Sequence, residues 1–191
     1  ADYYIVYEVV PSDWVATTPT SYMVVITSGV HERLPDFGNF HKVMLTLFKF
    51  EDVWGDGKYD DADHGIAGWA ITVTGPGVPG GSVTVYTDEF GYAYVWVCAA
   101  GTYTVTEEDR DGWCHTTSPV VYVDVISGHA WPSAYVEFGN FECVDITIFK
   151  FEDVDGDGVY DPRIDEPIEG WLIYAWEYYT GELRYLYTDE D

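Results

Sequence analysis

The sequence predicts an all-β protein whose strands form antiparallel β-sandwiches. Residues 92–97 and 102–106 alternate between two faces and are rich in aromatic and β-branched side chains, as half-buried strands are. Residues 120–126 form a third run of this kind, and turn signals recur about every 8–12 residues, the spacing of sandwich strands. Gly101 is expected to make the hairpin turn between the first two runs. No segment has a helical hydrophobic period of useful length.

The composition excludes several classes of partner. The net charge is −26 at pH 7, and so acidic a chain repels phosphate, which makes nucleic acid and anionic membrane surfaces poor partners. Hydrophobic residues make up 47% and aromatic residues 18%, which indicates a folded chain. No apolar run reaches the roughly 18–20 residues that span a bilayer, so membrane insertion is not expected. The chain begins Ala1-Asp2, as a mature or excised product would.

The three cysteines, Cys98, Cys114 and Cys143, are an odd number and leave at least one thiol unpaired. No CxxC pair is present, which excludes zinc-ribbon and thioredoxin motifs. At most one disulfide can form within the chain, and we expect three partly buried free thiols instead.

The chain is a tandem repeat in a broken frame. The segment FKFEDV at 48–53 returns at 149–154, and FGNF at 37–40 returns at 138–141 with the same spacing. Residues 41–141 form one complete unit. Residues 1–40 match only the C-terminal part of a unit, and residues 142–191 match only its N-terminal half. The sequence therefore predicts one complete and two partial sandwich units, with 1–40 supplying candidate donated strands.

The second repeat carries an acidic loop whose spacing is that of an EF-hand-like calcium site. Carboxylates stand at loop positions 1, 3, 5 and 9, and Gly158 at position 6 permits the sharp bend. Calcium prefers six to eight hard oxygen ligands, which alternate side chains of a tight turn can direct at one centre. The expected ligands are Asp153, Asp155, Asp157, the carbonyl of Val159, Asp161, and Asp165 or Glu166 as the closing carboxylate.

The first repeat carries a weaker version of the same loop. Its expected ligands are Asp52, Asp56, the carbonyl of Lys58, Asp60 and the closing Asp63. Trp54 replaces the acid at position 3, so this site has lost a ligand. The alternative for both loops is a solvated acidic turn without a metal.

The ordered motifs resemble a known family. GIAGW at 65–69, TDEFGY at 87–92, AGTYTVTE at 100–107 and the two acidic loops fall in the order found in B-type repeats of serine-aspartate repeat surface proteins. These repeats belong to the Cna-B, prealbumin-like group with an Ig-like β-sandwich fold. The resemblance implies an extracellular, calcium-stiffened domain that serves as a stalk or spacer of surface adhesins and filaments.

Some Cna-B relatives carry an internal Lys–Asn or Lys–Asp isopeptide bond assisted by a Glu. Lys49, Glu107 and Asn140 are the matching residue types in corresponding strands. Lys49 alternates with two core leucines, and an unpaired lysine in a core would be costly. We favour the alternative that Lys49 extends to solvent and pairs with Glu51 or a loop carboxylate, because the calcium-loop branch usually lacks the bond.

The two partial units are apolar on both faces, unlike the complete one. The complete unit presents alanine and threonine outward, whereas the corresponding positions of the partial units hold large apolar side chains. A large exposed apolar patch usually marks an interface. The candidate interface residues are Tyr3, Ile5, Tyr7, Leu172, Tyr174, Trp176, Tyr185 and Tyr187.

These observations predict a non-enzymatic structural protein whose copies polymerise head-to-tail by strand addition. Scattered histidines and the lack of a nucleophile elbow leave no support for a catalytic site. A strand like 91–99 has no counterpart in the partial units, so the chain is either a subunit or a window of a longer array. The alternatives are a passive spacer of a longer adhesin and a carbohydrate-binding module that stacks a glycan on Tyr174, Trp176, Tyr185 and Tyr187.

Overall fold

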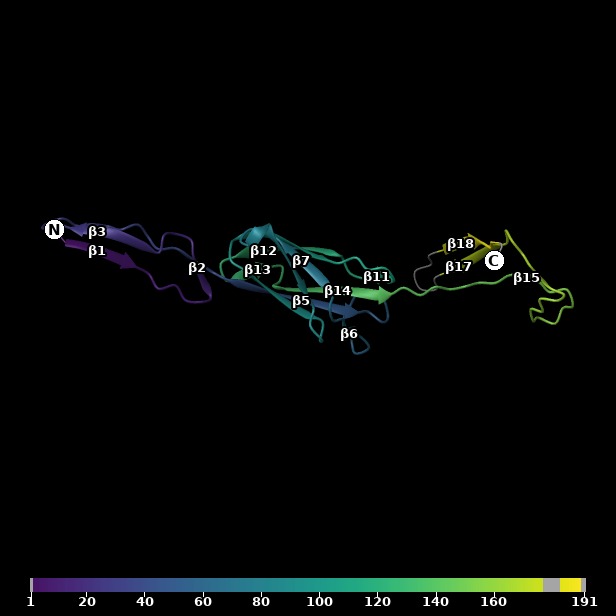
Figure 1. Cartoon of the computed structure of the whole chain (residues 1–191). Coiled ribbons are helices and arrows are strands. Elements are labelled where there is room, and N and C mark those ends of the chain that lie inside the picture. The colour runs from purple at the N-terminus through teal and green to yellow at the C-terminus, as the bar shows by residue number, and fades with distance from the viewer. Residues whose placement is uncertain (1, 177–182, 190–191) are drawn as a thin grey trace. The chain divides into compact units, whose positions relative to one another are not determined.

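The structure is a computed structural model that describes residues 2–176 and 183–189. The described residues form β-strands and one short 3-10 turn, η1 (Pro79–Gly81), which confirms the predicted all-β class. None of the described residues forms a helix long and apolar enough to cross a membrane. The chain divides into two compact units, residues 1–143 and 144–191 (Figure 1).

The first unit contains a β-sandwich of two sheets between residues 43 and 142. In sheet order, one sheet contains β13 (His129–Trp131), β12 (Val120–Ile126), β10 (Gly101–Glu107), β7 (Ala70–Thr74) and β8 (Ser82–Tyr86). The other contains β11 (Trp113–His115), β14 (Tyr135–Glu142), β5 (Val43–Glu51) and β6 (His64–Gly65), with β9 (Tyr92–Val97) also paired to β5.

Alternation along each strand builds the core between the sheets. Ile71 and Val73 of β7 are fully buried, while the threonines beside them lie on the outer face and bond across to β8, as Thr72 does to Thr84 at 2.8 Å. The largest buried side chain of the core is Trp69, just before β7. The predicted inward and outward faces of this hairpin are confirmed.

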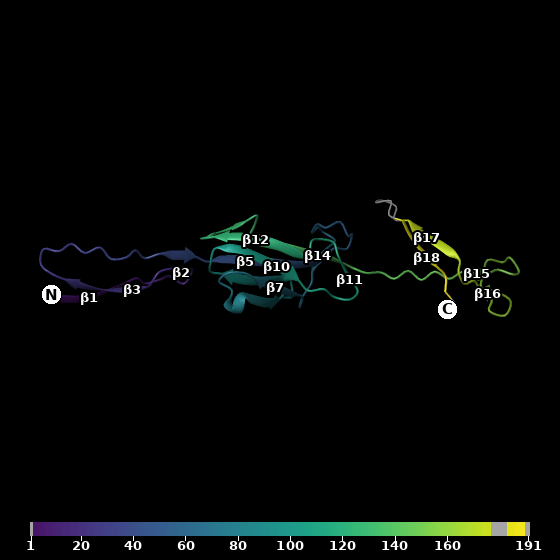
Figure 2. The same ribbon diagram turned by 90° about the horizontal axis from the view of Figure 1, so that it is seen from above.

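Two pairings differ from the sequence-based prediction. Strands β9 and β10 lie in different sheets, so the predicted hairpin with Gly101 as its turn is wrong, and residues 98–100 cross between the sheets. A period-two pattern shows that each run is a strand but not which sheet it joins. Strand β14 lies beside β5 (Figure 2) and runs parallel to it, with Phe138 opposite Lys49. Every other pairing among the described strands is antiparallel.

Residues 2–41 form two short strand pairs. Strand β1 (Asp2–Tyr7) pairs with β3 (Ser21–Ile26), and β2 (Trp14–Ala16) pairs with β4 (Asn39–His41). All six residues of β1 are exposed. This hairpin therefore makes strand hydrogen bonds without a second sheet against either apolar face.

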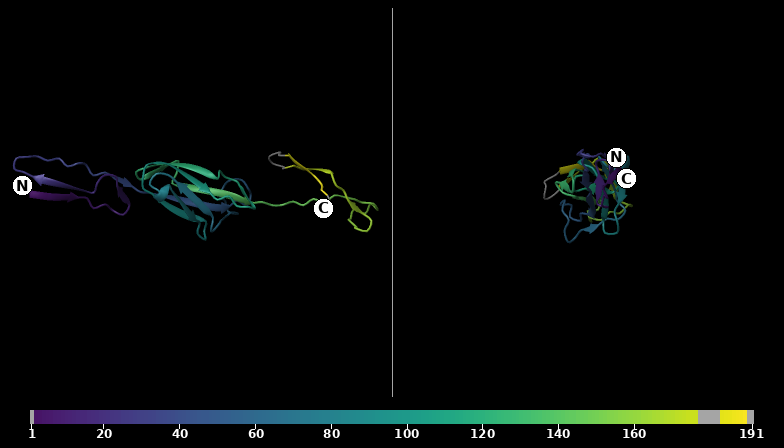
Figure 3. Two further views of the ribbon diagram at one scale, coloured as in Figure 1. Left: turned by 45° about the horizontal axis from the view of Figure 1, so that its top comes forward. Right: turned by 90° about the vertical axis from the view of Figure 1, so that its left-hand side faces the viewer.

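Among its described residues, the second unit also contains two strand pairs; this unit is drawn in light green and yellow in Figure 3. Strand β15 (Phe151–Glu152) pairs with β16 (Glu166–Pro167), and β17 (Leu172–Trp176) pairs with β18 (Leu183–Tyr187). The predicted partial unit 142–191 includes residues 177–182 and 190–191, which lie outside the described residues.

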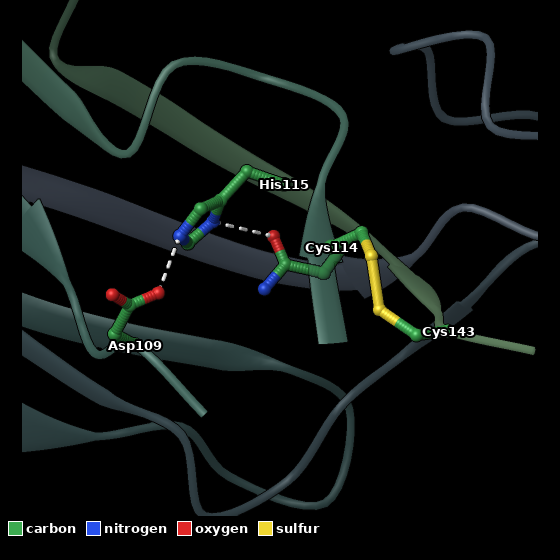
Figure 4. The surroundings of a disulfide bond; sticks show 5 residues. Asp109, Cys114, His115 and Cys143 are labelled. Atoms are coloured by element: carbon green, nitrogen blue, oxygen red, sulfur yellow. Dashed lines mark hydrogen bonds and ion pairs between the residues drawn. A yellow bond between two sulfur atoms is a disulfide. The ribbon is translucent and has the colours of Figure 1, made fainter. Parts of the chain in front are cut away.

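A disulfide joins Cys114 to Cys143, so the prediction of three free thiols is wrong (Figure 4). Strand β11 pairs with the end of β14, with Cys114 opposite Phe141, and this pairing brings the two cysteines to a Cα separation of 5.9 Å. Cys98 remains a free thiol. The bond closes the last strand of the sandwich onto its neighbour.

Removing this disulfide should destabilise the first unit. The bond closes a segment with a sequence separation of 29 residues. Loop-closure entropy of the unfolded chain then corresponds to about 3–4 kcal/mol of unfolding free energy. Cys114→Ser should lose this amount in guanidinium unfolding followed by Trp fluorescence, while Cys98→Ser is the matched control and should unfold like the parent. Equal unfolding midpoints for Cys114→Ser and the parent would contradict the expectation.

Candidate functional site

A buried ion pair joins the two sheets of the sandwich. Lys49 on β5 is 0% exposed, and its Nζ lies 3.3 Å from Oε2 of Glu107 on β10. Lys49 Nζ also donates a hydrogen bond of 3.0 Å to the carbonyl of Phe138 and lies 4.6 Å from the Trp69 ring centroid. The preferred prediction that Lys49 extends to solvent is wrong, because its side chain follows the inward face of β5. Glu51, its expected partner, pairs with His64 instead.

Asn140 and His115 complete the polar cluster. His115 Nδ1 lies 3.0 Å from Glu107 Oε1 and 3.2 Å from Asn140 Oδ1, so it can donate to either oxygen. Its Nε2 lies 2.9 Å from Asp109 Oδ1. Asn140 is fully buried, and its Nδ2 has no hydrogen-bond partner among the described residues.

The three predicted residues thus belong to one cluster, with Lys49 in contact with Glu107 and with Asn140 linked to Glu107 through His115, the member that sequence reasoning missed. Ala16 occupies the corresponding position of the N-terminal partial unit, so comparison of the repeats gave no sign that His115 has a role in the cluster. Only its place on a strand near Glu107 could have indicated it.

Burial changes the protonation of this cluster. Desolvation lowers the pKa of Lys49 to about 8 and raises the pKa of Glu107, although the opposite charges partly offset both effects. Desolvation alone would lower the pKa of His115, but the hydrogen bond to Asp109 and the charge of Glu107 raise it. The cluster can therefore hold a neutral amine, a protonated carboxyl and a primary amide side by side. These are the reactants and the acid of an aminolysis.

The first acidic loop directs its carboxylates at its own backbone. Asp52, which is fully buried, accepts hydrogen bonds from the N–H groups of Asp56 at 3.1 Å and Gly57 at 2.6 Å. Asp63 accepts from Val53 at 2.9 Å and from Asp60 at 2.8 Å. Within the described ranges, no three metal-binding side chains of this loop gather at one point. Its carboxylates hold the loop closed.

The second acidic loop gathers three of the predicted calcium ligands. One carboxylate oxygen each from Asp153, Asp155 and Asp165 lies within 4.8 Å of the others. The other two aspartates have different partners. Asp161 accepts a hydrogen bond of 2.9 Å from Nε of Arg163, and Asp157 accepts one of 2.7 Å from the backbone N–H of Val159. Glu166, in β16, is exposed and outside the group. Asp153, Asp155 and Asp165 could therefore hold a divalent cation, and calcium binding by either loop stays a prediction.

The candidate interface residues lie on exposed faces of two hairpins. In β17–β18, Leu172 is opposite Tyr187 and Tyr174 is opposite Tyr185, and residues directly opposite share a face. Trp176 lies on this face and is 72% exposed. On β1, Tyr3, Ile5 and Tyr7 share a face and are each about 70% exposed. Each partial unit therefore carries an uncovered apolar face within its own described residues.

Comparison with known proteins gives matches among solved structures only. No protein-family model matches the chain, and no curated protein matches it. One similar structure is GBS52, a minor pilin of Streptococcus agalactiae, at 12% identity and a TM-score of 0.41, covering 67% of this chain and 62% of that one.

Two further structures are of the same kind. A streptococcal ancillary pilin shares 16% identity at a TM-score of 0.40, covering 99% of this chain and 60% of that one. The shaft pilin SpaA of Lactobacillus rhamnosus GG shares 12% identity at a TM-score of 0.36, covering 78% and 75%. The chain spans less than two thirds of the first two structures. At these identities and scores the matches are likenesses alone.

Proposed function

We propose that this chain is a subunit of an extracellular surface filament in which copies join head-to-tail by strand complementation. One observation carries the proposal: the two partial units hold complementary parts of the hydrogen-bond network that the complete unit contains, although neither supplies the strand that corresponds to β9. Each part keeps local contacts of the complete unit while its apolar faces remain uncovered.

The N-terminal half keeps the contacts of the end of the complete unit. The N–H of Glu8 donates to the carbonyl of Thr20, as that of Glu107 donates to Pro119. Two further backbone hydrogen bonds recur in the same way. The N–H of Thr17 donates to the carbonyl of Gly38, as that of Thr116 donates to Gly139. The N–H of Lys42 donates to the carbonyl of Asp13, as that of Cys143 donates to Gly112. Residues 2–42 therefore present the later strands of a sandwich in their native arrangement.

The C-terminal half keeps the contacts of the start of the complete unit. Trp171 N–H donates to Thr188 Oγ1 at 2.9 Å, and Thr188 Oγ1 donates to the carbonyl of Ile168 at 2.6 Å. Trp69, Thr87 and Ile66 make the same two bonds at 2.9 and 2.6 Å in the complete unit. This half lacks the strands that β10, β12 and β14 supply in the complete unit.

The complete unit supplies the register for joining the halves. There β10 pairs with β7, with Val105 opposite Val73. Strand β1 corresponds to β10 and β17 to β7, so β1 of one copy would pair with β17 of the next. The transferred register places Ile5 opposite Trp176 and Tyr7 opposite Tyr174. Strand addition of this kind satisfies open-edge backbone groups, and each buried apolar side chain contributes about 1.5–3 kcal/mol.

Three features suit such a subunit to an exposed filament. A structural disulfide indicates an oxidising compartment outside the cytoplasm. The Lys49, Glu107 and Asn140 cluster supports an internal Lys49–Asn140 amide bond that would lock the sandwich. Calcium held by Asp153, Asp155 and Asp165 would screen the repulsion between the acidic side chains of the second loop.

The internal amide bond predicts a loss of mass. Attack of the Lys49 amine on the Asn140 side chain releases ammonia, so a peptide joining the two residues should be lighter by one ammonia molecule than its parts. Tandem mass spectrometry of digested protein tests this. Asn140→Ala should abolish the joined peptide and Lys42→Arg should preserve it. A digest in which Lys49 and Asn140 occur only in separate peptides would rule the bond out.

Calcium removal predicts a lower melting temperature. A ligand bound at 100 times its Kd stabilises the folded state by about 2.7 kcal/mol. Asp155→Asn should remove most of the calcium-dependent shift in calorimetry, and Asp56→Asn should remove less, because only the second loop gathers three ligands. The same melting temperature in calcium and in excess chelator would exclude stabilisation of the folded protein by calcium.

Strand complementation predicts that the N-terminal strand is required for assembly. Deleting residues 1–10, or introducing Ile5→Asp, should abolish filaments seen by negative-stain microscopy, because the deletion removes the donated strand and the substitution places a charge opposite Trp176 of the next copy. Thr104→Asp, at the corresponding half-buried position on the outer face of the complete unit, is the matched control and should leave assembly intact. Filaments of normal length from the truncated protein would show that β1 is not donated.

A further inference from the structure

The reactive cluster of the complete unit recurs in the partial units, but its members are divided between them. The repeat places Lys150 at the position of Lys49, in the C-terminal half. It places Glu8 and Asn39 at the positions of Glu107 and Asn140, in the N-terminal half. No single partial unit therefore holds all three.

The N-terminal half holds its acid and its amide in direct contact. Asn39 Nδ2 donates a hydrogen bond of 2.7 Å to Glu8 Oε2. The second carboxylate oxygen of Glu8, Oε1, and the amide oxygen of Asn39, Oδ1, are buried and have no hydrogen-bond partner among the residues that the structure describes. Two buried acceptors without donors are costly, and an ammonium or amine group would satisfy them.

The C-terminal half holds its lysine in the corresponding geometry. Lys150 Nζ donates to the carbonyl of Phe151 at 3.0 Å and lies 4.8 Å from the Trp171 ring centroid. Lys49 Nζ makes the same two contacts, with Phe50 at 3.4 Å and with Trp69 at 4.6 Å. What Lys150 lacks, within the described part of the chain, is a carboxylate at ion-pair distance like Glu107. The donor of one half thus complements the unpaired acceptors of the other.

We infer that complementation brings Lys150 of one copy to Glu8 and Asn39 of the next, where an amide bond forms between Lys150 Nζ and Asn39 Cγ. The inference rests on the proposed strand complementation and adds a covalent seam to it. Charge supports the fit, because the Lys150 ammonium of one copy would meet the Glu8 carboxylate of the next, which has no cationic partner among the described residues.

The chemistry balances within these three side chains. The Lys150 ammonium first gives a proton to the Glu8 carboxylate, and the resulting amine attacks Asn39 Cγ, so that a new C–N bond forms and the bond from Cγ to Nδ2 breaks. The Glu8 carboxyl gives its proton to the departing nitrogen, which leaves as ammonia, and the carboxylate then takes the second proton of the attacking nitrogen. A primary amide and an amine become a secondary amide and ammonia, with no oxidation or reduction.

Glu8 is placed for the second of these proton transfers. Its Oε2 already contacts Nδ2 of Asn39, the nitrogen that leaves. In the complete unit His115 contacts both Glu107 and the oxygen of Asn140, but the corresponding residue Ala16 has no such group. Glu8 therefore serves as the only proton donor and acceptor in direct contact with the Asn39 amide among the described residues.

Two measurements on the 191-residue chain test the covalent cross-link between copies. The chain is assembled, examined by negative-stain microscopy, then boiled in detergent with reductant and separated by gel electrophoresis. We expect filaments in the microscope and a ladder of multimers on the gel, with a digest peptide joining Lys150 to Asn39. Filaments that dissolve completely to monomers would overturn the covalent seam and leave strand complementation standing. A failure to form filaments and ladder alike would overturn both.

Matched variants identify the partners. Lys150→Arg and Asn39→Ala should each give only monomers on the denaturing gel while still forming filaments, and Lys42→Arg should keep the ladder. Mixing the first two variants should give dimers and nothing longer, because each copy retains one competent end. A ladder that persists in Lys150→Arg, or a mixture that yields no dimer, would overturn the assignment.

Discussion

The burial of Lys49 between the two sheets is the constraint on which the sandwich depends. Its strand lies in one sheet and Glu107 lies in the other, so the 3.3 Å ion pair spans the core. A charge removed from water is tolerated only with close, well-bonded partners. The positions of β5, β10 and β14 are therefore tied together by Lys49, Glu107 and the carbonyl of Phe138. The apolar layers pack around this fixed point.

The acidic loops show how a chain with a net charge of −26 keeps its carboxylates in place. The carboxylates of Asp52 and Asp63 accept hydrogen bonds from backbone N–H groups of the first loop, and those of Asp153 and Asp165 do the same in the second unit. A tyrosine of each loop packs edge-on against a phenylalanine of the preceding strand, Tyr59 on Phe48 of β5 and Tyr160 on Phe151 of β15. Each loop is thus packed against the strand that precedes it.

Sequence reasoning predicted what local patterns encode. The strands 92–97 and 120–126 and the outward threonines of β7 follow from period-two alternation, and the class of fold follows from them. The sheet to which β9 belongs and the parallel direction of β14 do not follow, because alternation carries no information about partners. The Cys114–Cys143 bond depends on the pairing of β11 with β14, which is equally nonlocal. Lys49 was misjudged because its burial depends on an acid in the facing sheet.

The parallel pairing of β5 with β14 has a mechanical consequence. These are the first and last long strands of the complete unit, and they are direct neighbours along six residue pairs from Tyr135 and Thr46 to Asn140 and Glu51. When the two ends of the unit are pulled apart, the load acts along this ladder, so its hydrogen bonds share the force in shear instead of opening one after another. The disulfide at Cys143 clamps the exit of β14 at the end of that ladder. Survival under tension is governed by the unfolding rate, and shear loading keeps that rate low.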